Sequence, residues 1–187
     1  MEPEDFALRL NVICVGDGKI VTHNGGNLST ENGTVLTNYL NEKLGNEDIK
    51  FIPGIQYRHL LIVKRASKHI VCAPPHDHPG EEWQGLLIKP EKGWEDKREE
   101  GRLSAKETAD LLNDLIVRSV DVLSQAPLNI ERKKEEKDLA NIIWPWSGGY
   151  RPAMQTLSEQ FPEIKSGAVV SAVDLIRGIG HYAGLDI

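Results

Sequence analysis

The stretch FALRLNVICVGDGKIVTHNGG, residues 6–26, decides the fold. It predicts an extended strand, a turn at residues 16–18 and a second strand that ends near His23, because Gly-Asp-Gly between two β-prone runs is typical of a hairpin. A chain that begins in this way places its first two strands antiparallel in one sheet.

Strands and helices alternate along the rest of the chain. Two amphipathic helices are expected, over residues 28–45 with Ser29 as N-cap and over residues 103–127 with Ser104 and Glu107 as a capping box. The other expected elements are strands at residues 49–54, 57–65, 69–75, 139–146 and 166–172, and helices at residues 151–161 and 173–185. We expect Pro145 to end its strand, residues 147–149 to form a turn, and the charged run at residues 131–138 to be a solvated loop or helix-end segment.

These patterns predict an α/β (α+β) fold, with helices packed on a mostly antiparallel or mixed sheet of about four to six strands. The length fits one compact domain over residues 1–187. Residues 74–102 change to Pro, Gly, Lys and Glu without a sustained period, so we expect a long loop there. Cys14 and Cys72 lie singly in apolar runs, which predicts buried, reduced thiols.

The composition argues against some classes of binding partner. Acidic residues outnumber basic ones by 28 to 22, a formal net charge of −6, so the overall field repels nucleic acid. A small anionic substrate remains compatible with this net negative charge, because a few convergent arginines in one cleft can reverse the potential locally. No apolar run approaches the roughly 18 residues of a membrane span, and the acidic start lacks the basic region of a signal peptide. We therefore expect a cytoplasmic protein that binds neither nucleic acid nor membranes.

Several short motifs carry side chains suited to an anion. In PPHDHPG, residues 74–80, neighbouring side chains point in opposite directions, which argues against a zinc site and leaves an anion contact or a plain exposed loop as alternatives. Arg58 suits carboxylate or phosphate binding and a structural ion pair equally well. The stretch IIWPWSGGYRPAM, residues 142–154, is either one part of an active site or a structural corner. By motif alone, no complete catalytic machinery is present.

Taken together, the motifs resemble those of one family. LRLNVICVGDGKI, FIPGIQYRHLLIVK, APPHDHPG, ANIIWPWSGGYRPAM and GAVVSAVDLIRGIGHYAGLDI occur in the order and at the spacing of the archaeal-type cofactor-independent (2,3-bisphosphoglycerate-independent) phosphoglycerate mutases. The resemblance covers essentially the whole chain. It implies an isomerase of the alkaline phosphatase superfamily that moves a phosphoryl group between the 3- and 2-positions of glycerate through a phosphoserine. Two divalent metals, manganese, magnesium or zinc, are implied for the full-length enzyme.

The resemblance further implies that this chain is the inserted, substrate-capping domain of such an enzyme. The family's nucleophile and metal ligands lie before and after this region, so we expect a fragment that is inactive alone and binds no metal or other cofactor. Its implied partners are phosphoglycerate and the catalytic core domain of the same polypeptide. The residues that match the family's motifs, and that we expect to bind substrate, are Arg9, Arg58, His59, His76, Asp77, Arg151 and Arg177.

Two other functions remain as alternatives. One is a related phosphotransferase of the same superfamily, such as a homoserine-kinase-like protein or a member labelled phosphonopyruvate decarboxylase. The other is a free-standing binding domain with no catalytic partner. An upstream nucleophile and a downstream Asp/His core in the same reading frame would separate the enzymes from the binding domain.

Overall fold

The computed structural model describes all of residues 1–187. The chain divides into two compact units, a first unit of Met1–Tyr150 and a second unit of Arg151–Ile187. The grouping of residues 1–187 into one functional domain stays a prediction.

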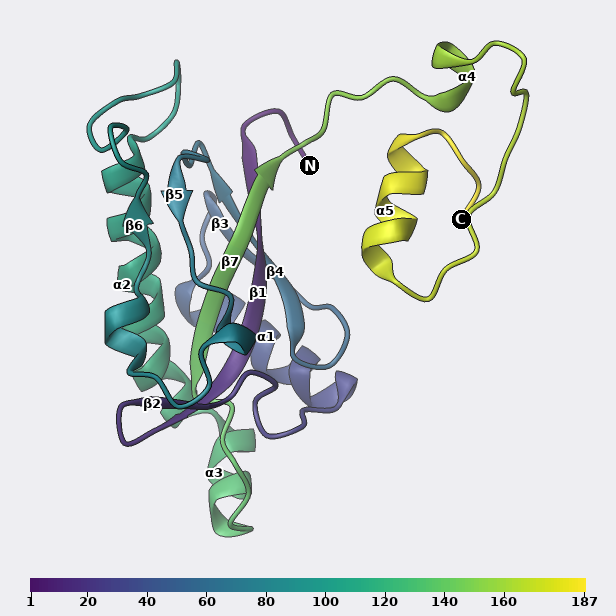
Figure 1. Ribbon diagram of the computed structural model, residues 1–187. Helices are drawn as coiled ribbons and strands as arrows, with labels where there is room; N and C mark the ends of the chain where they lie inside the picture. Colours follow the sequence, from purple (N-terminus) through teal and green to yellow (C-terminus); the bar gives the residue numbers. More distant parts are fainter. The chain divides into compact units, whose positions relative to one another are not determined.

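The first unit is built on a five-stranded antiparallel sheet (Figure 1). Its central strand is β1, which pairs with β4 along one side, with β7 along the other and with β2 at its carboxyl end, while β3 extends the sheet beyond β4. The predicted hairpin and the mostly antiparallel α/β fold are therefore confirmed. The strands are β1 (Asp5–Gly16), β2 (Lys19–Thr22), β3 (Ile49–Ile52), β4 (Arg58–Lys64) and β7 (Ile142–Tyr150).

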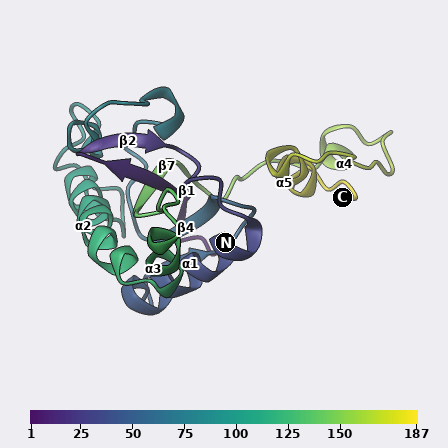
Figure 2. The ribbon, with the colours of Figure 1, turned by 90° about the horizontal axis from the view of Figure 1, so that it is seen from below.

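Three helices belong to this unit: α1 (Thr30–Leu44), α2 (Ala105–Ser124) and α3 (Pro127–Lys134). The predicted caps are confirmed, since the Ser29 side chain accepts a hydrogen bond from the backbone of Asn32, and Ser104 forms a capping box with Glu107. Helices α1 and α2 contact each other and lie on the same side of the sheet (Figure 2). Their leucines meet the alternate residues of β1 in one core, formed by Phe6, Leu8, Leu10, Val12, Leu36, Leu40, Leu112 and Leu115.

Residues 74–102 contain short elements between irregular segments. These are the 3-10 helices η1 (Pro75–Asp77) and η2 (Trp83–Leu86) and the strand β6 (Lys89–Pro90), which pairs with β5 (Ile70–Val71). The strand expected over residues 69–75 is thus only two residues long. Its continuation is held instead by a side chain, because the Trp144 indole Nε1 donates a hydrogen bond to the carbonyl of Ala73 at 2.7 Å.

Strand β7 corrects two predictions. Pro145 does not end the strand but lies within it, opposite Leu10, because β7 is an edge strand, where a proline's missing N–H is tolerated. Residues 147–149 do not form a turn. The register between β1 and β7 shifts by one residue, and Ser147 adopts a left-handed conformation with φ 50°, as in a β-bulge.

The charged run at residues 131–138 is a third correction, because it is not uniformly solvated. Its first part forms the end of α3, as the helix-end alternative predicts, but Arg132 is only 6% exposed. The Arg132 guanidinium donates hydrogen bonds to the carbonyls of Gly25, Gly26 and Asp138. The charge pattern does not predict that Arg132 is buried. Its hydrogen-bond partners are backbone oxygens, which are present whatever the residue type.

The second unit is less regular than predicted. Helix α4 (Leu157–Gln160) begins at a capping box of Thr156 and Glu159 instead of at residue 151, and the proline at position 162 stops it after one turn. The strand expected over residues 166–172 is reduced to a single bridge between Ala168 and Asp186. Helix α5 (Asp174–Tyr182) confirms the predicted closing helix.

Candidate functional site

A cation–aromatic pair on β1 and β7 is the starting point of the candidate site. The guanidinium carbon of Arg9 lies 4.8 Å from the ring centre of Trp146, its partner across the two strands. The bulge at Ser147 follows directly and changes which side chains of β7 face the core. Beyond it, Gly148 takes a core-facing position, where an added Cβ would overlap Cζ of Phe6.

A buried asparagine links this pair to the loop after β2. The Trp146 indole Nε1 donates a hydrogen bond to Oδ1 of Asn11 at 3.0 Å, and the Asn11 amide donates to the carbonyl of His23 at 3.1 Å. Asn11 is 4% exposed, so these bonds satisfy a polar group that would otherwise be costly to bury. They also place His23 beside the sheet.

The 3-10 helix η1 brings His76 to the same place. The ring centre of His76 lies 5.2 Å from that of Trp146 and 6.1 Å from that of His23. Asp77 follows in η1, and its carboxylate Oδ1 lies 3.7 Å from Nε2 of His76. Both side chains are exposed, so they remain open to a ligand from solvent.

Arg58 reaches the group from β4. It is the cross-strand partner of Asn11, and its guanidinium carbon lies 4.5 Å from the ring centre of Tyr57, which in turn lies 5.6 Å from that of His23. We call the set of Arg9, Asn11, His23, Tyr57, Arg58, His76 and Trp146 the arginine–aromatic cluster. Arg9 and Arg58 have no carboxylate within 4.0 Å, whereas Arg65, Arg98, Arg118 and Arg177 all pair with one.

His59 lies beneath this cluster and supports it. It is 4% exposed, and its Nδ1 accepts a hydrogen bond from the backbone of Gly54 at 3.1 Å. Burial lowers the pKa of the imidazole from 6.5 to about 4, so the ring is neutral at pH 7. The buried neutral ring thus accepts a hydrogen bond from the loop at residues 53–57, which leads into Arg58, and a contact of His59 with substrate stays a prediction.

The structure brings together some of the seven predicted residues and not others. Arg9, Arg58, His76 and Asp77 meet in one region of the first unit. Arg151 and Arg177 belong to the second unit, where both are exposed and Arg177 lies 3.7 Å from Asp174 of the same helix.

The cluster also contains Asn11, His23 and Tyr57, which the sequence analysis missed, and Trp146, which it considered only as a member of the stretch at residues 142–154. The alternation of β1 places residues 9 and 11 on one face of a strand, a signal that would have found Asn11. The contacts of His23 and Tyr57 depend on loops, for which the sequence carries no comparable signal.

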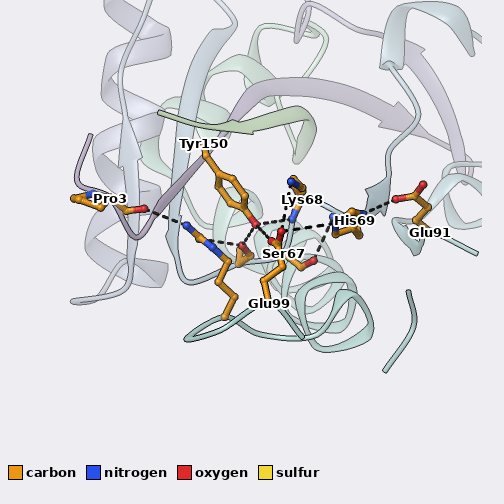
Figure 3. A network of polar contacts seen from close by, with 9 residues as sticks. Pro3, Ser67, Lys68, His69, Glu91, Glu99 and Tyr150 are labelled. Atoms are coloured by element: carbon orange, nitrogen blue, oxygen red, sulfur yellow. Dashed lines mark hydrogen bonds and ion pairs between the residues drawn. The ribbon is translucent and has the colours of Figure 1, made fainter. Parts of the chain in front are cut away.

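A second polar network fixes the end of β7 (Figure 3). The Tyr150 hydroxyl accepts a hydrogen bond from the backbone of Lys68 at 3.0 Å and shares its own hydrogen between the carbonyl of Ala66 and the carboxylate of Glu99. Burial, together with the bond to Glu99, raises the pKa of Tyr150 to about 12. The guanidinium of Arg102 lies 3.8 Å from the centre of the same ring. Tyr150, the last residue of the first unit, is therefore firmly anchored.

The chain is similar to known proteins in its sequence and its fold. The model of the family described as 2,3-bisphosphoglycerate-independent phosphoglycerate mutase matches residues 1–129, and the chain belongs to this family. The protein of that name from Methanosarcina barkeri is 38% identical over 185 residues, which are 98% of this chain and 42% of the relative. A probable member from Geobacter sulfurreducens is 35% identical over 187 residues and is likewise covered over 42% of its length.

The solved structures agree on the fold. The cofactor-independent phosphoglycerate mutase from Thermoplasma acidophilum superposes with a TM-score of 0.64 over 100% of this chain and 47% of its own, at 23% identity. The PH0037 protein from Pyrococcus horikoshii gives the same TM-score at 19% identity, and 38% of its chain is covered. This chain therefore spans about two fifths of the length of the curated relatives that it matches.

Two further findings concern metals and membranes. No three His, Cys, Asp or Glu side chains converge in a way that would hold a metal ion. No helix is both long enough and apolar enough to cross a membrane.

Proposed function

We propose that this chain is the substrate-capping part of a metal-dependent phosphoglycerate mutase that interconverts 3-phosphoglycerate and 2-phosphoglycerate. The observation that carries the proposal is the arginine–aromatic cluster, in which Arg9 and Arg58 lie on one sheet face without any carboxylate partner, in a chain of this family. Arg58 makes one long hydrogen bond to Oε1 of Gln56, at 3.5 Å, and neither arginine is held by a charge, so donors of both guanidinium groups stay available for an anion.

The cluster has the chemistry that a phosphoglycerate requires. The guanidinium of an arginine donates two parallel hydrogen bonds to a carboxylate or phosphate, and the substrate carries one of each. Trp146 and Tyr57 lie under Arg9 and Arg58 and restrict their side chains, so less conformational entropy is lost when an anion binds. His76 and His23 add ring N–H groups beside them.

The proposed role in the reaction is positioning and exclusion of water. A capping domain that closes over the substrate orients the transferring group and protects a phosphoserine from hydrolysis. The phosphorylated serine and the two divalent metals would be supplied by the part of the relatives' length that has no counterpart in this chain. When bound there, the metals would polarise the phosphoryl oxygens.

According to this proposal, the isolated chain binds phosphoglycerate but does not catalyse its conversion. A titration with 3-phosphoglycerate, followed by ¹⁵N NMR, is expected to shift the Trp146 indole N–H and the amides of residues 9, 58 and 76. Arg9→Ala and Arg58→Ala are expected to weaken binding about tenfold or more each, since a charge-assisted pair contributes about 1.5–3 kcal/mol. Arg118→Ala, which removes an exposed arginine of α2 paired with Asp114, is the matched control and is expected to bind as the unchanged chain does.

Three results would contradict the proposal. Interconversion of the phosphoglycerates at an enzymatic rate by residues 1–187 alone, with manganese or magnesium added, would show that the chain needs no further catalytic part. If the chain bound inorganic sulfate and 3-phosphoglycerate with equal affinity, the cluster would be a general anion site. If millimolar 3-phosphoglycerate did not shift the NMR signals of these residues, the cluster would not be the substrate-binding site.

A further inference from the structure

Two asparagines of the first unit are each followed directly by glycine, and they lie in different surroundings. Asn24 precedes Gly25 in the loop after β2, and Asn32 precedes Gly33 in the first turn of α1. An asparagine loses its side-chain amide when the next backbone nitrogen attacks its Cγ, and a following glycine has no Cβ to hinder that attack. The state of each glycine nitrogen therefore decides whether the pair reacts.

The nitrogen of Gly33 is held in a hydrogen bond. Its N–H donates to the carbonyl of Ser29 at 2.9 Å, the first hydrogen bond of α1. A Cβ at this glycine would overlap the carbonyl oxygen of Gln56, and the Gln56 N–H donates to Oγ1 of Thr30 at 3.3 Å. The start of the helix is thus covered by the loop at residues 53–57, and attack by this nitrogen requires that the first turn open.

The nitrogen of Gly25 makes no such bond. Gly25 is buried with φ 59°, yet its N–H donates no hydrogen bond, whereas the N–H of Gly26 donates to Oγ1 of Thr22 at 3.1 Å. Buried N–H groups rarely lack an acceptor. The Asn24 side chain is half-buried, and its two hydrogen bonds to Asn27, at 2.8 and 3.1 Å, are exposed to solvent. Water therefore reaches the side-chain amide next to an unbonded nitrogen.

We propose that Asn24 is a site of spontaneous deamidation in the folded protein and that Asn32 is protected. The nitrogen of Gly25 attacks Cγ of Asn24, the new N–Cγ bond closes a five-membered succinimide ring, and the Cγ–Nδ2 bond breaks. Nδ2 leaves as ammonia with the proton that the Gly25 nitrogen loses. Water then opens the ring. Cleavage at Cγ gives aspartate, and cleavage at the backbone carbonyl carbon gives isoaspartate, whose backbone is longer by one methylene group.

The chain is fixed on both sides of Asn24, so the modification disturbs its neighbours. Before it, the carbonyl of His23 accepts a hydrogen bond from the Asn11 amide at 3.1 Å. After it, the carbonyl of Gly25 accepts one from the Arg132 guanidinium at 3.1 Å. Isoaspartate adds a backbone atom between these two points, so one of the bonds has to lengthen or break. Aspartate adds no backbone atom, but it places a negative charge one residue, about 3.8 Å between Cα atoms, from His23 of the arginine–aromatic cluster.

Peptide mass spectrometry of residues 1–187, stored at mildly alkaline pH, tests the proposal. Cleavage after Glu31 places the two Asn-Gly pairs in different peptides. Loss of the amide is expected to be at least about tenfold faster at Asn24 than at Asn32, because only the nitrogen of Gly33 must first give up a hydrogen bond. In the chain unfolded by urea, the two pairs are expected to react at similar rates. Equal rates in the folded chain would overturn the proposal, as would a difference that persists in urea.

Matched substitutions identify the reacting residue. Asn24→Gln keeps an amide but would require a six-membered ring, so it is expected to remove nearly all deamidation of the folded chain. Asn32→Gln is the control and is expected to leave the total release of ammonia unchanged. Similar losses of ammonia release in both variants would contradict the proposal.

A second variant tests the restraint on the Asn24 side chain. Asn27→Gly removes the hydrogen-bond partner of Nδ2 and tolerates the φ of 57° at this position. It is expected to speed deamidation at Asn24 by about twofold to tenfold and to leave Asn32 unchanged. An unchanged or lower rate at Asn24 would show that the side chain is not in reach of the Gly25 nitrogen.

The effect on ligand binding is measured separately, because it rests on the proposed function whereas the deamidation does not. As the modified fraction grows, the chain is expected to lose affinity for 3-phosphoglycerate, and Asn24→Gln, stored in the same way, is expected to keep it. Fast deamidation with unchanged affinity would contradict the link between this loop and the arginine–aromatic cluster. An intact Asn24 after prolonged storage would contradict the modification site itself, whatever the affinity.

Discussion

Arg9 and Trp146 are partners across strands β1 and β7, and the guanidinium carbon of Arg9 lies 4.8 Å from the centre of the indole ring. The indole also donates a hydrogen bond to Asn11, two residues further along β1. The ring is therefore fixed on two sides, and the arginine that rests on it has fewer accessible rotamers than a free surface arginine. An anion site built on such an arginine depends on the register of β7 as much as on the arginine itself.

Removing the arginines separates a binding role from a structural one. In a full-length mutase that contains this chain, Arg9→Ala and Arg58→Ala are each expected to lower kcat/KM by about 10–100-fold, because a charge-assisted pair with the substrate is lost. The melting temperature is expected to change by less than about 2 °C, since neither residue pairs with a carboxylate. Steady-state kinetics and thermal unfolding measure the two effects. A large fall in melting temperature with unchanged kinetics would identify both arginines as structural.

Two adjacent glycines of β7 test the importance of the bulge. Gly148→Ala is expected to lower the free energy of unfolding by about 1–3 kcal/mol, because the new Cβ overlaps the ring of Phe6 and the ring is fully buried. Gly149→Ala is the control, since a Cβ there meets nothing within 4 Å and replacement of a strand glycine is neutral or slightly stabilising. Urea unfolding of both variants measures the difference. If Gly148→Ala and Gly149→Ala had equal free energies of unfolding, β7 would be able to shift its register to accommodate the added Cβ.

The fold follows from the sequence wherever the determining interactions are local. The hairpin at residues 16–18 and the caps at Ser29 and Ser104 depend on neighbouring residues, and all three are confirmed. The prediction that Pro145 ends its strand is wrong, because the tolerance of this proline depends on β7 being at the edge of the sheet. Edge position is a property of the assembled sheet and cannot be read from the residues nearby.

The candidate site, like the fold, is predicted from the sequence only in part. Arg9, Arg58 and His76 are predicted from their motifs, and their side chains suit anions wherever they lie. Trp146 is predicted only as a member of the stretch at residues 142–154, since its pairing with Arg9 depends on the register of β7, and His23 is not predicted, because it reaches the site through the loop after β2. Long-range contacts of this kind are decided by packing, and a single sequence carries no record of them.

His59 gives a pH dependence whose sign is fixed by its burial. The pKa is lowered from 6.5 to about 4 in the folded protein, so between these values the unfolded chain binds a proton that the folded chain does not. Stability is therefore complete above pH 6.5 and falls as the pH drops toward 4, by up to about 3 kcal/mol. His59→Asn keeps an acceptor for the backbone of Gly54 and does not titrate. Urea unfolding from pH 4 to 8 should show a flatter profile for His59→Asn, and parallel profiles would contradict the buried neutral ring.

Arg132 is expected to be the most costly residue of the charged run to replace. Its guanidinium is the donor for the carbonyls of Gly25, Gly26 and Asp138, so Arg132→Met leaves these buried or half-buried hydrogen bonds unmade. We expect a loss of about 2–4 kcal/mol in the free energy of unfolding, since each unsatisfied buried group costs about 1–3 kcal/mol and neighbouring losses are not additive. Lys133→Met, at the exposed neighbouring position of α3, should change stability by less than about 0.5 kcal/mol. Because Gly25 and Gly26 closely follow His23, Arg132→Met should also shift the NMR signals of His23, whereas Lys133→Met should leave them in place. An unchanged His23 in a destabilised Arg132→Met variant would show that the loop and the arginine–aromatic cluster are energetically independent.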